Sequence, residues 1–202
     1  MPQISVVNYG VGNLRSVKRG LEKSGAEVLI TSKPRDILDS DAIVFPGVGA
    51  FSAAVKNLTA LTSTVIQSVE EGKPLLGICL GLQLLFTHSS EGGFTEGLDL
   101  ISGEIVKLPN SVKIPQMGWN TVNVVSSHSM LEGISDPFYA YFVHTYYPRP
   151  SRKEVIVATT DHGVRFPSIV AKNNLFATQF HPEKSGKEGL KILKNFVKKV
   201  KR

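Results

Sequence analysis

The sequence predicts a single α/β domain over residues 1–202, built on an open, mostly parallel sheet with helices on both faces and an antiparallel addition in its C-terminal half. A chain of 202 residues fits one hydrophobic core. In the first half, short β-branched runs alternate with helical patterns, which is typical of a parallel sheet covered on both sides. After Gly103, strand patterns follow one another directly, which indicates antiparallel neighbours.

The expected elements of the first half follow from their apolar patterns. Strands are expected at 3–8, 26–30, 41–45 and 74–78. Helices are expected at about 13–24, at 50–71, where Gly72 ends the pattern, and at 80–87. Sites in an open α/β sheet lie beyond the carboxyl ends of its strands, so the turns after these strands are the candidate positions.

The second half is expected to add six strands and a final helix. The strands are expected at 104–108, 120–125, 139–144, 154–160, 168–172 and 175–180. From 184 to 202 the chain has eight Lys or Arg and one Glu, a net of +7 against +6 for the whole chain. Apolar residues recur there at helical spacing, which indicates a docked helix with a solvated basic face. No nucleic-acid motif accompanies it, so we expect no nucleic-acid partner.

Composition and terminal sequence indicate a cytoplasmic protein. The chain is 42% hydrophobic and 20% charged, as in an ordinary soluble globule. The first residues, MPQISVVNYG, lack the basic start and apolar core of a signal peptide. The longest apolar run, 74–86, is too short to span a bilayer, so no membrane association is expected. The single cysteine and five scattered histidines indicate no disulfide and no metal site. No cofactor is expected.

The only cysteine, Cys79, lies in the stretch GICLG, where a buried strand is expected to become a helix. Small residues on both sides of a strand-turn-helix junction are typical of a nucleophile elbow. A thiol at that position lies near a helix N-terminus, whose partial positive charge favours thiolate. A free cysteine that is only a small buried hydrophobe is the alternative interpretation.

The stretch QFHPEKS supplies a base and a residue to orient it. Pro182 restricts His181 to an extended conformation, and residues two apart in an extended segment face the same way. Glu183 can then accept from one imidazole nitrogen while the other faces Cys79. Alone, His-Pro-Glu could be a surface turn.

A thiolate that attacks a carbonyl needs hydrogen-bond donors for the oxyanion. In FPGVGAF, Gly47 and Gly49 permit unusual backbone dihedrals, so the N–H of Val48 can turn toward the site. The N–H of Leu80, first on its helix, is the natural second donor. A glycine turn that merely opens a helix is the alternative.

The pairing of Gly-x-Cys-x-Gly with a distant His-Pro-Glu resembles the class I, or triad, glutamine amidotransferases. Further stretches resemble more narrowly the glutaminase subunits of imidazole glycerol phosphate synthase, in histidine biosynthesis. These stretches are NYGVGNLRSV, FPGVGAF, GICLGLQLLF, PQMGWN, YFVHTYY and QFHPEKS. The resemblance runs from the first strand to the last helix, and no family catalytic position departs from the pattern.

The resemblance implies a role for each matching residue. Cys79 would attack the side-chain amide of glutamine to give a thioester and ammonia, His181 would move the proton, and Glu183 would orient His181. Gln83 would face the substrate, and Glu91 would hold its amino group. The amino-acid pocket would be lined by the backbone at Val143, His144 and Thr145. His144 is not needed as a base, so a satisfied structural histidine is its simpler interpretation.

The family also implies a partner, a cyclase subunit with a (β/α)8 barrel, in a one-to-one heterodimer. Trp119, the only tryptophan, comes after Met117 and Gly118 in PQMGWN, and an exposed aromatic residue is a common interface anchor. Ammonia would pass through this contact to a ribonucleotide substrate. Lys184 and Asn13 would face the same partner.

Three other functions fit parts of the pattern. A cysteine hydrolase or chaperone of the related elbow folds usually has histidine after its cysteine, whereas Leu80 follows here. A binding module with a degenerate triad disagrees with the intact Cys79, His181 and Glu183. A glutaminase that serves another synthase, for example that of anthranilate or pyridoxal phosphate, differs only in its acceptor.

Overall fold

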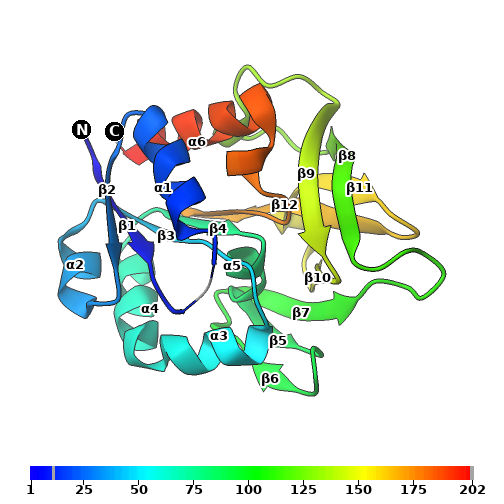
Figure 1. Cartoon of the computed structure of the whole chain (residues 1–202), viewed down its shortest axis with the longest axis horizontal. Coiled ribbons are helices and arrows are strands. Elements are labelled where there is room, and N and C mark those ends of the chain that lie inside the picture. Colours follow the sequence, from blue (N-terminus) through cyan, green and yellow to red (C-terminus); the bar gives the residue numbers. More distant parts are fainter. Residues whose placement is uncertain (11, 201–202) are drawn as a thin grey trace.

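The structure is a computed structural model that describes residues 1–10 and 12–200. Position 11, inside the candidate turn at 8–13, and positions 201–202, at the end of the basic stretch, lie outside the described residues. A nine-stranded sheet has the order β2-β1-β3-β4-β13-β12-β11-β8-β9 (Figure 1). A separate four-stranded sheet has the order β10-β7-β5-β6.

Five neighbouring strands form the parallel half of the large sheet, and most of their residues are buried. They are β2 (Glu27–Thr31), β1 (Gln3–Val7), β3 (Ala42–Phe45), β4 (Leu75–Ile78) and β13 (Leu175–Thr178). β13 returns from the far end of the sequence to pair with β4, and Ile78 is in register with Thr178. The turns after β4 and β13, far apart in the sequence, therefore begin side by side.

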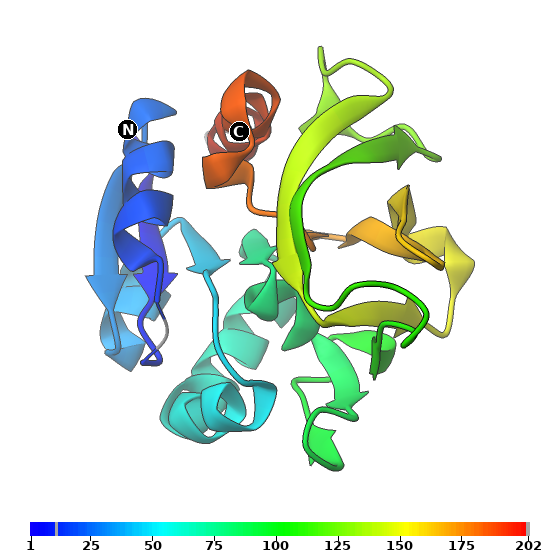
Figure 2. The same cartoon turned by 45° about the vertical axis from the view of Figure 1, so that its right-hand side comes forward.

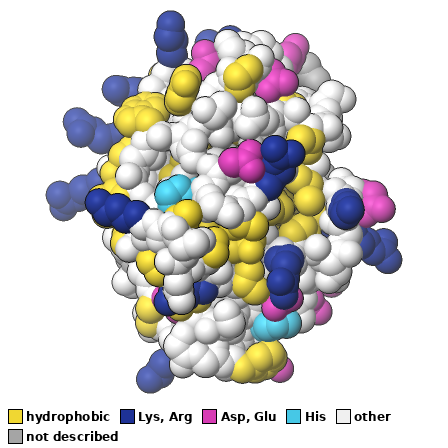
Figure 3. Space-filling model, turned by 90° about the vertical axis from the view of Figure 1, so that its right-hand side faces the viewer, with side chains coloured by type: hydrophobic (Ala, Val, Ile, Leu, Met, Phe, Trp, Pro, Cys, Tyr) yellow, Lys and Arg dark blue, Asp and Glu magenta, His cyan; other side chains and the backbone are white. Residues whose placement is uncertain are grey.

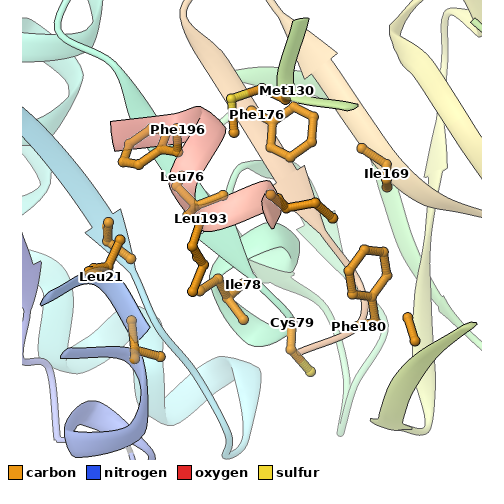
Figure 4. Close-up of a cluster of buried hydrophobic side chains, with 14 of the residues drawn as sticks. Leu21, Leu76, Ile78, Cys79, Met130, Ile169, Phe176, Phe180, Leu193 and Phe196 are labelled. Atoms are coloured by element: carbon orange, nitrogen blue, oxygen red, sulfur yellow. The ribbon is translucent and has the colours of Figure 1, made fainter. Parts of the chain in front are cut away.

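Helices cover both faces of this parallel half (Figures 1 and 2). One face packs against α1 (Leu14–Lys23) and α6 (Gly186–Val200), and the other packs against α2 (Pro34–Asp39), α3 (Phe51–Leu58) and α4 (Thr62–Glu70). On the first face, Leu21 of α1 and Leu193 of α6 join Leu76 and Ile78 of β4 in one buried cluster (Figure 4). Figure 4 shows Cys79 at the edge of that cluster.

The second half of the sequence forms the antiparallel part of the fold. It extends the large sheet with β12 (Arg165–Lys172), β11 (Ile156–Asp161), β8 (Gln116–Val124) and β9 (Phe138–His144). The smaller sheet contains β5 (Phe86–Ser89), β6 (Thr95–Glu96), β7 (Ile101–Lys107) and β10 (Tyr146–Pro150). The predicted α/β class, with a parallel sheet and an antiparallel addition, is confirmed.

Several expected boundaries were wrong. The single helix expected at 50–71 is divided into α3 and α4 by a 3₁₀ turn at Thr59–Leu61. The helix expected at 80–87 ends after one turn as α5 (Leu80–Gln83), and Phe86 already belongs to β5. The strand expected at 104–108 lies in the smaller sheet as β7, outside the large one.

The final helix docks as expected, with one exception. Leu193, Phe196 and Val197 of α6 are buried, whereas Leu190 is exposed and lines a cavity with Arg19 of α1. Among the described residues, no helix combines the length and the apolar composition needed to cross a bilayer.

Candidate active site

Cys79 forms a strained elbow between β4 and α5. Its backbone has φ 53° and ψ −106°, a conformation that non-glycine residues rarely adopt. The turn is possible because its glycines let backbone segments approach closely: a Cβ at Gly81 would lie 2.0 Å from the carbonyl oxygen of Phe45. The N–H of Cys79 donates to the carbonyl of Thr178, at 2.7 Å, which fixes the elbow to the end of β13. Since α5 has only one turn, its dipole adds little to the site.

His181 and Glu183 lie directly beyond β13, within reach of this elbow. His181 is fully buried and extended, with φ −97° and ψ 97°, as expected before a proline. Glu183 lies in a 3₁₀ turn (Pro182–Lys184), not in the extended segment we expected. The turn still brings its Oε1 to 2.8 Å from Nδ1 of His181, because the turn folds the chain back over the imidazole.

The imidazole of His181 is held in its charged form by its neighbours. Burial lowers the pKa of His181, but hydrogen bonding and charge interactions with Cys79 and Glu183 outweigh burial and raise the pKa to about 10. The contact with the thiol is loose, since Nε2 is buried and makes no well-formed hydrogen bond. The thiol of Cys79 also contacts the carbonyl of Val143, with Sγ and O 3.7 Å apart.

A cavity of about 250 Å³ opens over the thiol, and its lining brings together most of the predicted site. Its walls are Val48, Gly49, Cys79, Leu80, Gln83, Glu91, Pro115, Val143, His144, Thr145 and Tyr146. Gly47 lies just behind this wall, where an added Cβ would be 2.7 Å from that of Leu80. Pro115 and Tyr146 were missed by sequence reasoning, because neither residue type indicates a substrate pocket.

Two predicted substrate residues also bind the protein framework. The amide Nε2 of Gln83 donates to the carbonyl of Tyr146, at 2.9 Å. The Oε2 of Glu91 accepts from the N–H of Phe51, at 3.0 Å, so this carboxylate holds the start of α3 directly after the glycine turn. Each side chain is therefore fixed at the cavity wall before any substrate arrives.

His144 is a buried neutral histidine. Nδ1 lies 2.9 Å from the carbonyl oxygen of Tyr146, and Nε2 lies 2.9 Å from the side-chain amide of Gln116. Burial is the main reason that its pKa falls to about 4. The Nε2 contact is with Oε1 of Gln116, and one of the two ring nitrogens of the neutral imidazole carries the proton. The imidazole thus joins the chain around Gln116 to the pocket wall, consistent with a structural histidine.

Tyr9 is a site residue that the sequence did not indicate. Its ring is buried, and its hydroxyl donates to the carbonyl of Pro46, immediately before the glycine turn. Burial, and secondarily the charge of Cys79, raise the pKa of Tyr9 well above 10.0. The phenol therefore stays protonated and holds the turn. Tyr9 follows β1 and Pro46 follows β3, so the two become neighbours only in the folded sheet.

The residues expected at a partner interface lie on the β8–β9 hairpin and next to the triad. Met117 and Trp119 are 66% and 58% exposed, and Tyr139 beside them is 66% exposed. Trp119 meets Tyr141 edge-on, with centroids 6.2 Å apart, and Nζ of Lys184 lies 5.7 Å from the centre of the Tyr141 ring. On the face that includes the antiparallel strands, hydrophobic side chains reach the surface between charged ones (Figure 3).

The N-terminal turn contributes Asn13, whose side chain contacts the triad itself: Nδ2 donates to Oε1 of Glu183. Within residues 1–10 and 12–200, no three or more His, Cys, Asp or Glu are grouped as metal ligands.

The chain matches the family of class-I glutamine amidotransferases over residues 5–200. It is 50% identical over 202 residues to "Imidazole glycerol phosphate synthase subunit HisH" of Natronomonas pharaonis, with 96% of this chain and 94% of that protein covered. The chain belongs to the HisH family of class-I glutamine amidotransferases. The HisH subunit of Archaeoglobus fulgidus is likewise 50% identical over 200 residues, which cover 98% of this chain and 100% of that protein.

A solved structure titled a glutamine amidotransferase superposes with a TM-score of 0.77 over 98% of this chain and 99% of that one. The sequence identity between the two is 21%. This HisH-family chain therefore shares the amidotransferase fold with relatives that have diverged widely in sequence.

Proposed function

We propose that this chain is the glutaminase subunit of imidazole glycerol phosphate synthase. It hydrolyses the side-chain amide of glutamine and passes the ammonia to a cyclase subunit in histidine biosynthesis. The observation that carries the proposal is that Cys79, at the strained elbow, lines a cavity and also interacts with the buried His181–Glu183 pair behind it. Membership of the HisH family supports the choice of pathway. We take residues 1–202 to be one cytoplasmic amidotransferase domain.

In the first half of the reaction, the thiolate of Cys79 attacks the amide carbon of glutamine and a carbon–sulfur bond forms. The oxyanion is met by the N–H groups of Val48 and Leu80. The first N–H groups of a helix have no intrahelical acceptor, so that of Leu80 is available. His181 gives its proton to the amide nitrogen, the carbon–nitrogen bond breaks, and ammonia leaves from a thioester.

In the second half, water attacks the thioester carbon while His181 takes one of its protons. The carbon–sulfur bond breaks and Cys79 leaves as thiolate beside the protonated His181, which restores the resting pair. The new carboxyl group of glutamate loses its remaining proton to water. Glu183 stays ionised throughout and stabilises the imidazolium. One missing oxyanion donor costs about 10²–10³ in rate, so the orientation of the Val48 peptide is a sufficient switch for a slow resting state.

The exposed hairpin residues support a docking surface for the cyclase, a (β/α)8 barrel in a one-to-one heterodimer. The same backbone connects that surface to the triad: the N–H of His181 donates to the carbonyl of Tyr141, at 3.0 Å. The N–H of Tyr141 donates to Oγ of Ser185, at 3.0 Å. A partner that contacts Trp119 and Tyr141 therefore acts on the strand that holds the base.

The experiment is to trace the amide nitrogen of glutamine. The chain and a cyclase subunit are combined with the ribonucleotide substrate, [amide-¹⁵N]glutamine and an excess of unlabelled ammonium. We expect glutamate and cyclase product in a ratio near one, with ¹⁵N in the product undiluted by the bulk ammonium. Glutamate formation without labelled product would identify a glutaminase for another acceptor. No glutamate in the complex would contradict the proposal.

A further inference from the structure

Asn13 makes a contact that the partner-facing role expected for it does not explain. Its Nδ2 donates to Oε1 of Glu183, the same oxygen that accepts from Nδ1 of His181. Nδ2 also lies 3.4 Å from that imidazole nitrogen. The amide therefore lies against the junction of the base and the residue that orients it.

The local structure at Asn13 does not require this arrangement. Asn13 precedes α1 at its N-cap position, where asparagine usually accepts a hydrogen bond from the first turn. Here the side chain makes no cap hydrogen bond, and the backbone has φ 75°, in the left-handed region. The amide therefore makes no hydrogen bond with the first turn of α1. It contacts instead the carboxylate of Glu183, which is distant in the sequence. Departures from local preference of this kind cluster at functional sites.

The carboxylate has few other donors. The side chain of Glu183 is fully buried, and its Oε2 has no hydrogen-bond partner in the described structure. Its two donors, Nδ2 of Asn13 and Nδ1 of His181, converge on Oε1. A buried charge needs donors, so loss of the amide leaves the carboxylate held by the imidazole alone.

We propose that Asn13 is a positioning residue of the triad: its amide fixes the Glu183 carboxylate against Nδ1 of His181. This inference rests on the proposed glutaminase function and adds a role to the partner contact expected for Asn13.

The first test is Asn13→Gly, which removes the amide and tolerates the left-handed backbone. A displacement of about 1 Å at a catalytic group can cost about 10²-fold in rate, so we expect kcat for glutamine to fall about 10- to 100-fold while KM stays within about twofold. Both values are measured in the free chain and in the complex with saturating cyclase. A loss seen only in the complex, or only in KM, overturns the proposal, because it reports partner binding or substrate binding instead.

Asn173→Gly is the matched control. Asn173 also has a left-handed backbone, with φ 55°, and lies exposed in the turn between β12 and β13. The two variants make the same chemical change at the same kind of backbone position. We expect Asn173→Gly to keep the wild-type kcat, and an equal loss in both variants contradicts a specific role for Asn13.

The second test is the titration of the imidazole, followed by ¹⁵N NMR. The titratable groups that interact with the imidazole, besides Glu183, are Cys79 from the elbow and neutral His144 from β9. Arg19 and Lys23 of α1, with Lys184, line the cavity that Glu183 also borders. All of these groups are unchanged in the Asn13→Gly variant, so a change in the pKa of His181 indicates that the Glu183 carboxylate has moved. We expect the pKa of His181 to fall toward 6.5 when Glu183 is released. An unchanged titration overturns the proposal.

Asn13→Asp gives an independent check. It keeps the shape but places a second carboxylate against Glu183, so we expect a loss of kcat at pH 8 that is partly recovered at lower pH, where one shared proton restores a donor. Wild-type rates across that range contradict the proposal. The NMR titration needs no substrate, so it tests the positioning role of Asn13 even if the chain proves not to be a glutaminase.

Discussion

The strained backbone of Cys79 shows how single residues define this site. A non-glycine residue in such a conformation costs about 1–3 kcal/mol, and the surrounding structure must offset it. Here the elbow is fixed by the hydrogen bond from Cys79 to Thr178 and by the close approach of Gly81 to Phe45. The thiol is consequently fixed at the cavity wall, and His181 lies beyond the end of β13, the strand next to β4.

Two substitutions separate the proton carrier from the residue that orients it. We expect Glu183→Gln to slow glutamine turnover less than His181→Ala, because only the imidazole moves a proton, while the carboxylate orients and stabilises it. Removal of a triad member elsewhere costs roughly 10⁴-fold or more. Single-turnover rates of glutamate release in the complex measure the order. A Glu183→Gln variant slower than His181→Ala would contradict these roles.

Because His144 is buried as a neutral imidazole, we expect it to make the folded chain less stable in acid. Its pKa is about 4 in the folded chain against 6.5 as the ordinary value, so between these values the unfolded chain binds a proton that the folded chain does not. Stability therefore falls as pH decreases from about 6.5 to about 4 and changes little from this source outside that window. The linkage relation gives a loss of about 2 kcal/mol between pH 7 and pH 4.5.

Urea unfolding at those two pH values checks this figure, with His144→Asn as the comparison. The asparagine does not titrate, so the variant should lose about 2 kcal/mol less than the wild type on acidification. Equal losses in both proteins would show that His144 is not the group responsible.

At the scale of elements, sequence patterns identified most strands but not every break. The apolar periodicity of 50–71 continues through the 3₁₀ turn at Thr59–Leu61, so nothing local marked the division of that helix. Two prolines in β10 argue against a strand, yet β10 is the edge of the smaller sheet, where proline is tolerated. α2 is a short helix begun by Pro34, and it was missed because it has only six residues.

In the candidate site, too, features marked by local sequence were predicted and contacts created by tertiary packing were not. The elbow at Cys79 and the extended backbone of His181 were predictable, because the glycines and the proline beside them restrict the backbone. The 3₁₀ turn that brings Glu183 back to the imidazole was not predicted. The contacts of Tyr9 with Pro46 and of Asn13 with Glu183 could not be predicted, because the two residues in each contact are distant in the sequence. Packing of α1 and β3 around the elbow creates those contacts.

The elbow itself predicts a sharp difference between two glycines. At Gly81 an added Cβ would overlap the Phe45 carbonyl, whereas at Gly92 it would meet nothing within 4 Å. We expect Gly81→Ala to lower the free energy of unfolding by about 3 kcal/mol or more. Gly92 has a φ of 67°, so Gly92→Ala should cost only about 1–2 kcal/mol from its backbone.

Urea denaturation of both variants gives the comparison directly. If Gly81→Ala is no less stable than Gly92→Ala, the close packing of the elbow on β3 is not what maintains it.

At the scale of the whole molecule, the antiparallel half adds an outer surface to the catalytic sheet. Its exposed aromatic residues lie on the hairpin whose β9 strand hydrogen-bonds to the segment of His181. The parallel half therefore supplies the nucleophile, and the antiparallel half connects the base with the surface we propose for the cyclase. In the proposed function, the glutamine site and the partner surface are therefore connected through the segment of His181.

Trp119→Ala should weaken assembly and leave the fold intact, because its side chain is 58% exposed. Truncation of an interface anchor can cost about 2 kcal/mol or more, roughly thirtyfold in affinity. Calorimetric titration against the cyclase measures this change, and the ratio of glutamate to product measures coupling. Lys184→Ala should act in the same direction. Unchanged affinity and ratio in both variants would remove this surface from the interface.

The central claim, that Cys79 makes the ammonia which the partner uses, is tested most directly by Cys79→Ala in the assembled complex. Product formation is measured once with glutamine and once with added ammonium salt as the nitrogen source. We expect glutamine-dependent synthesis to disappear, because no other group can form the thioester, and ammonia-dependent synthesis to stay near the wild-type rate, because that chemistry belongs to the cyclase. Equal loss of both activities in a folded, assembled variant, or survival of the glutamine-dependent one, would contradict the account.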